Sequence, residues 1–147
     1  MHRTIFSPII FFILFLLTSC GSYSLEDFEE EGKGVIRSLV QELKSIHTRE
    51  QLKASSAKLQ RLFDQLVTVI IAAKEFSESH PELDSGTFLA HQHELSDQLR
   101  TELNRIYRFE GGRQMIEKCQ EKALNRLDAF EKKSSRHKED NRLLMEK

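Results

Sequence analysis

TREQLKASSAKLQRLFDQLVTVIIAAKEFSES, residues 48–79, is the stretch of sequence that decides the fold. Its large apolar side chains recur at helical spacing on two adjacent rows: Leu52, Leu59, Leu66 and Ala73, then Phe63 and Ile70. Thr48 and Gln51 form a capping-box pattern at its start, in which each side chain can satisfy a backbone amide of the other. Between residues 66 and 73 the helix is apolar nearly all round, which predicts the central helix of a helical core.

The alternative for this stretch is a buried strand, because residues 67–71 are rich in β-branched side chains. Nothing else in the sequence has the pattern of a pairing strand, so the helix is preferred. Pro81 disfavours helical geometry at His80, which places the end of the helix near Ser79.

Three further amphipathic segments accompany the central helix. Ser24 can cap the first of them, whose early turns are weakened by Gly32 and Gly34. Glycine readily adopts the left-handed conformation that closes a helix, so a diglycine ends the second segment just after Tyr107 and Phe109. We expect these helices at about residues 25–46, from Asp84 or Ser85 to Gly111-Gly112, and from about Arg113 to residue 131.

Short connections predict that helices adjacent in sequence run antiparallel. The chain is therefore expected to be all-α, an up-and-down antiparallel bundle of four helices over residues 25–131. A three-helix core with a loosely packed first segment is the variant. The charged residues 132–147 form either a solvated extension of the last helix or a disordered tail. Their basic cluster, residues 132–138, can contact anionic headgroups or a partner, or remain solvated.

The charge balance argues against a nucleic-acid binder. The 147 residues include 22 Lys and Arg against 23 Asp and Glu, a net charge of −1. Phosphate recognition calls for an excess of basic side chains. The length fits a single domain with one core.

Candidate metal and catalytic residues are few. His91 and His93 are two residues apart, so on a helix they point about 200° apart and cannot share one ion. His91 and Glu94 share a face, but two ligands do not complete a zinc site. The acidic run 29–31 lacks the alternating ligands and glycine of a calcium loop. The sequence has no nucleophile elbow, phosphate loop or dinucleotide fingerprint, so we expect no enzyme, no metal and no cofactor.

The N-terminus has the parts of a secretory signal: Arg3, an apolar run at residues 9–17, and small residues before Cys20. Nine apolar residues are too few for a transmembrane helix, which needs about 20. The tetrapeptide Leu17-Thr18-Ser19-Cys20 resembles the lipobox of bacterial lipoproteins, and the resemblance covers residues 1–20. It implies that residues 1–19 are a lipoprotein signal peptide, that the Cys20 thiol carries a diacylglyceryl thioether, and that residues 20–24 are a lipidated tether.

The same resemblance implies a location. Acyl chains such as palmitate at Cys20 would hold the chain on a membrane facing away from the cytoplasm, in the cell envelope or periplasm. Gly21 resembles the residue after the cysteine in lipoproteins sent to an outer membrane, which favours that membrane in a two-membrane bacterium. Cys119 then has no disulfide partner within the chain. We expect a buried thiol there, with an intermolecular disulfide or a reactive thiol as the alternatives.

For function, the sequence predicts a membrane-anchored extracytoplasmic lipoprotein with a structural or protein-interaction role in the bacterial cell envelope. Its partners would be the membrane, through the lipid anchor at Cys20, and an envelope protein. Self-association is a further option, and nucleic acid is excluded. The alternative function is binding of a small ligand or a metal between the helices, in a cavity among Phe63, Ile70, Leu95 and Leu99.

Overall fold

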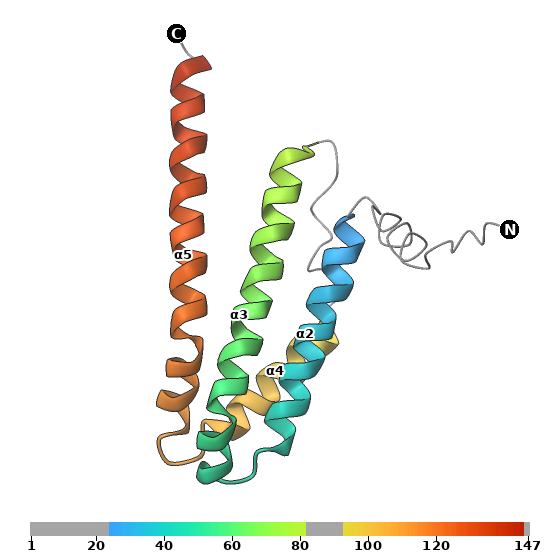
Figure 1. Ribbon diagram of the computed structural model, residues 1–147, viewed down its shortest axis with the longest axis vertical. Coiled ribbons are helices and arrows are strands. Elements are labelled where there is room, and N and C mark those ends of the chain that lie inside the picture. Colours follow the sequence, from blue (N-terminus) through green and yellow to red (C-terminus); the bar gives the residue numbers. More distant parts are fainter. Residues whose placement is uncertain (1–23, 82–92, 146–147) are drawn as a thin grey trace, which may run out of the picture.

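The structure is a computed structural model that describes residues 24–81 and 93–145. It has four helices: α2 (Leu25–Ser45), α3 (Arg49–Ser79), α4 (His93–Ile106) and α5 (Gly112–Met145). Every regular element in these two ranges is a helix, so the prediction of an all-α four-helix fold is confirmed (Figure 1). The expected N-caps Asp84 and Ser85 lie outside the described residues.

Reciprocal hydrogen bonds fix the starts of α2 and α3, as the sequence predicts. Ser24 Oγ accepts from the Asp27 amide, while the Asp27 carboxylate accepts from the Ser24 amide at 2.8 Å. Thr48 and Gln51 make the same exchange at the start of α3. Each capping box satisfies backbone donors that have no partner inside the helix.

α3 lies between α2 and α5, and these three helices form one layer (Figure 1). α2 runs antiparallel to α3. α5 runs parallel to α3, because their contacts rise together from Ser56 with Cys119 to Glu78 with Ser134. Chain direction therefore alternates from helix to helix as predicted. The α3–α5 neighbours, however, are a parallel pair that are not consecutive in sequence.

α4 is the shortest helix and runs obliquely behind α2, toward the turn that leads into α5 (Figure 1). It packs mainly against α2. Its 14 residues compare with 31 in α3 and 34 in α5, so the four helices overlap only where α2 ends and α5 begins. We call this the bottom end of the molecule, and the opposite end, where α2 begins, the top end.

The main hydrophobic core lies at the bottom end. Its fully buried large side chains come from all four helices and the first connection: Leu39, Leu43, Ile46, Leu52, Leu59, Ile106 and Ile116. Full burial of one such side chain stabilises the fold by about 1.5–3 kcal/mol. Because α2 contributes Leu39 and Leu43, the variant with a loosely packed first segment is wrong.

A second, smaller cluster joins α2 to α3 at the top end. The ring of Phe28 lies 5.7 Å from that of Phe76, centroid to centroid, beside Val69 and Ala73. Gly32 is buried, and a Cβ there would lie 3.7 Å from the Val69 side chain. α2 is thus one helix through both of its glycines, as expected, and its first turns are held by packing.

The end of α4 differs from the expectation. α4 stops at Ile106, so the prediction that Tyr107 and Phe109 belong to this helix is wrong. Both rings still pack against the main core, and apolar spacing alone cannot tell such a turn from another turn of helix. The diglycine does separate the two helices: Gly111 has a φ of 69°, and Gly112 begins α5.

The charged C-terminal residues continue α5. The helix extends to Met145, so of the two forms expected for this region, the extension of the last helix is the one observed for residues 132–145. In Figure 1 this part of α5 projects past the end of α3.

Arg105 joins α4 to the end of α2. Its guanidinium donates to the carbonyl oxygens of Leu43 at 2.6 Å and Ile46 at 2.7 Å. Its Nε donates to the Glu102 carboxylate at 2.8 Å. The last carbonyls of a helix have no partner within that helix, so this side chain from α4 supplies donors that α2 lacks.

We expect Arg105→Ala to lower the free energy of unfolding by about 1.5–3 kcal/mol, because it removes two hydrogen bonds from a charged donor to partly buried carbonyls. Urea unfolding followed by circular dichroism measures this loss. Arg100→Ala is the matched control on the same helix: Arg100 is exposed and pairs with exposed Asp97, so its removal should cost less than about 0.5 kcal/mol. Equal losses in the two variants would show that the α4–α2 bridge contributes no stability.

The glycines offer a second pair of matched substitutions. A Cβ at Gly112 would lie 2.1 Å from the carbonyl oxygen of Ile106, whereas a Cβ at Gly34 meets no atom within 4 Å. Gly112→Ala should therefore destabilise the protein by more than about 1 kcal/mol. Gly34→Ala should stabilise it by up to about 1 kcal/mol, since alanine is the better helix former. The shifts in melting temperature should have opposite signs, and a shared sign would contradict this account of the α4–α5 turn.

Candidate functional site

The contact between α3 and α5 changes character along its length. At the bottom end it is apolar, with Ile116, Cys119 and Ala123 of α5 buried in the main core. Further up it is polar: Arg126 pairs with Asp64 at 2.7 Å and also donates to the Thr68 hydroxyl. Nearest the top end it includes the contacts of Lys74 with Glu131 and of Ser134 with Glu78.

Cys119 is part of this contact and is almost wholly buried. Its side chain is 3% exposed, and its thiol donates to the carbonyl oxygen of Ser56 at 3.7 Å. Burial raises the pKa of the Cys119 thiol, so the thiolate needed for nucleophilic or redox chemistry is disfavoured. The expectation of a buried thiol is confirmed, and the reactive-thiol alternative is not supported by this geometry.

Two adjoining hollows run along the outside of the α3–α5 contact. They share Gln60, Lys118 and Cys119 in their linings. We call them together the α3–α5 groove. One hollow extends toward the start of α3, and the other toward Asp64 and Asn125.

The groove carries more positive than negative charge. Its basic lining residues are Arg49, Lys53, Arg61, Lys118 and Lys122. Its acidic ones are Glu50, Asp64 and Glu121. Since Asp64 is already paired with Arg126, the remaining surface favours a ligand segment with carboxylates. The sequence did not predict this groove, because helical periodicity shows which face is buried but not which two helices share it.

Of the histidine and acidic candidates, those within the described residues form no metal site. His91 lies outside the described residues, and Glu94 is exposed in the first turn of α4. Among residues 24–81 and 93–145, no three His, Cys, Asp or Glu side chains come together as metal ligands would. In the acidic run, Glu29 and Glu30 both pair with Lys33, at 2.8 and 2.9 Å. The hydrogen bond and charge of Lys33 lower the pKa of the Glu30 carboxyl, as on an ordinary solvated helix face.

The four residues expected to line a small-ligand cavity are divided between core and surface. Phe63 is buried in the main core, and Leu99 packs against it. Ile70 and Leu95 are half-buried. Binding of a small apolar molecule among them stays a prediction.

Neither the protein-family models, nor the curated proteins, nor the solved structures include a match to this sequence or fold. Within the described part of the chain, α2 to α5 are each too short or too polar to cross a membrane. Cys20, the expected lipidation residue, lies outside the described residues.

Proposed function

We propose that this chain is a lipid-anchored protein of the bacterial cell envelope whose helical body binds another envelope protein. The anchor is supported by the lipobox-like residues 17–20, which follow an apolar run too short to span a bilayer. The interaction role is supported by the α3–α5 groove, a hollowed surface between two helices with more basic than acidic side chains.

The chemistry of the anchor is a thioether between the Cys20 sulfur and a diacylglyceryl group. One acyl chain binds a bilayer only marginally, whereas two or more hold a protein stably. With this anchor the helical body stays on the side of the membrane away from the cytoplasm, and Gly21 favours the outer membrane where the cell has two. The role of the anchor is then permanent localisation.

The groove favours a protein ligand over a small substrate. It lies open between two helices and is lined by several charged side chains, whereas sites for small molecules are clefts that bury most of the ligand. An acidic helix or loop of a partner can pair with Lys53, Lys118 and Lys122, which are all exposed. The groove is the single observation in the structure that most favours binding over catalysis.

Cys20→Ala tests the anchor. We expect it to abolish metabolic labelling with palmitate and to leave the precursor uncut, because the acylated sulfur is gone. Cys119→Ala is the control, since it removes the other cysteine of the chain and should leave labelling unchanged. Labelling that survives Cys20→Ala, or that disappears in Cys119→Ala, would refute acylation at Cys20.

Photo-crosslinking in intact cells tests the groove. A photoreactive amino acid at Gln60, in the lining shared by both hollows, should give a product with one other envelope protein. The same amino acid at Gln41, an exposed glutamine on α2, is the matched control and should not give that product. Capture of the same protein from both positions, or a product from Gln60 that contains only this chain, would rule out the groove as the binding surface for a different protein.

A further inference from the structure

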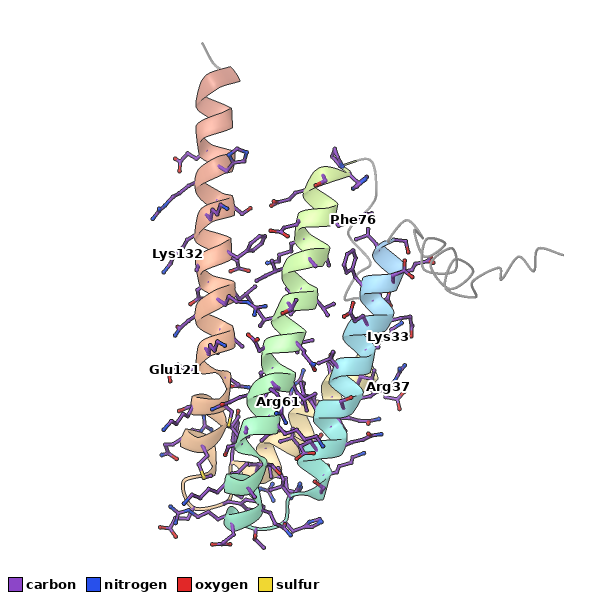
Figure 2. All side chains as sticks on the ribbon, in the orientation of Figure 1. Lys33, Arg37, Arg61, Phe76, Glu121 and Lys132 are labelled. Carbon is purple, nitrogen blue, oxygen red and sulfur yellow. The ribbon has the colours of Figure 1, made fainter. Side chains whose placement is uncertain are left out.

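The two outer edges of the helical layer carry charge in opposite order. α2 forms one edge and α5 the other, with α3 between them (Figure 1). Figure 2 shows Lys33 and Arg37 on the α2 side of the molecule, and Glu121 and Lys132 on the α5 side, each pair directed away from α3. Apart from Glu121, which also lines the α3–α5 groove, the residues of these edges lie outside that groove. The function proposed above does not depend on them.

The α2 edge is acidic at the top end and basic below. Its stripe is Glu26, Glu30, Lys33, Arg37 and Lys44. The spacings of three, four and seven residues keep these side chains on one side of a helix, away from the buried face that contains Phe28 and Leu39. Glu26, Glu30, Arg37 and Lys44 are exposed.

The α5 edge has the reverse order. Its stripe is Glu117, Glu121, Asp128, Lys132 and Arg136, all of them exposed. The spacings of four and seven residues again define one helix face, opposite the face that buries Ile116, Cys119 and Ala123. This edge is acidic toward the bottom end and basic toward the top end.

Contacts with α3 fix the height of each charge. At the top end, Phe28 of α2 lies against Phe76 of α3. Ser134 of α5 donates to Glu78 of α3, close to Phe76, so the start of α2 is level with residues near 134. At the bottom end, Glu42 pairs with Lys58, close to Ser56, which meets Cys119. The acidic Glu26 and Glu30 of α2 are therefore level with the basic Lys132 and Arg136 of α5. Lower down, Lys33 and Arg37 are level with Asp128 and Glu121, and Lys44 is level with Glu117.

We propose that these edges bind each other in neighbouring copies of this chain, with the α2 edge of one copy against the α5 edge of the next. At each level the facing charges are opposite, and the two helices meet antiparallel. The two surfaces differ, so the contact is heterologous and builds a row or ring of copies. The inference rests on the lipid anchor proposed above, because copies held at Cys20 in one membrane share the same orientation and height.

The physics of the contact predicts how strong it is. Exposed ion pairs contribute little individually and are screened by salt. Association is therefore weak in dilute solution. Confinement to a membrane raises the effective concentration of the copies and makes weak lateral contacts productive.

A thiol-specific crosslink in intact cells tests this arrangement. The full chain with Glu30→Cys, Lys132→Cys and Cys119→Ala should give a ladder of dimers, trimers and larger products with a short bismaleimide. The matched control combines Glu30→Cys with Glu117→Cys and Cys119→Ala. Residue 117 lies about 20 Å below the level of residue 30 at 1.5 Å per residue, so this variant should give no ladder. Absence of a ladder in the first variant, a single dimer band, or equal ladders in both would overturn the proposal.

Charge reversal gives an independent readout. In the crosslinkable chain, Arg136→Glu with Asp128→Lys should reduce the ladder on the order of tenfold, because facing charges now repel. Adding Glu26→Lys with Lys33→Glu to the same chain should restore it, since each reversed charge then faces an opposite charge again. A variant that stays impaired after both reversals contradicts the pairing. Palmitate labelling is measured separately on the same samples. Labelled protein without a ladder would refute the self-association alone, whereas unlabelled protein would refute the lipid anchor.

Discussion

The rest of the structure depends on the packing of α3 against two helices at once. α3 meets α2 on one side and α5 on the other, and Leu66 and Ile71 in its middle pack against the main core. Leu59 and Phe63 are buried in the core that α2 and α5 share. A helix that packs on two opposite sides produces a layer, and a layer has two edges. The groove and the charged stripes both follow from this one arrangement.

Stability is distributed unevenly along that layer. The bottom end has a core from all four helices, and Arg105 adds donors to the end of α2. The top half joins α2 to α3 through a small cluster around Phe28, and joins α3 to α5 through exposed pairs such as Lys74 with Glu131. Exposed ion pairs contribute about 0–1 kcal/mol each. Local opening therefore costs least at the top end, which is also the end nearest Cys20 in sequence.

The sequence predicted where the helices begin and end better than it predicted which helices pack against each other. The capping boxes at Ser24 and Thr48, the end of α3 at Ser79 and the buried Cys119 follow from local chemistry, because each depends on residues a few positions apart. The pairing of α3 with α5 does not, since an amphipathic pattern shows that a face is buried and not what covers it. The prediction that Tyr107 and Phe109 belong to α4 was wrong for a similar reason. Apolar side chains that are buried in a turn can have the same spacing along the sequence as those buried in a helix. Arg105 gave no local signal at all, because its partners Leu43 and Ile46 lie some sixty residues away.

The same limit applies to charge. Read along the sequence, Glu26 to Lys44 and Glu117 to Arg136 are mixed-charge helix faces of the kind that usually face water. They become related only when α3 sets α2 and α5 in fixed register, one antiparallel and one parallel to it. A shift of one helical turn, about 5.4 Å, would place Lys33 level with Lys132 and turn attraction into repulsion. The apolar contacts of the core therefore set the register on which any specificity at the polar edges depends, although the core itself touches no partner.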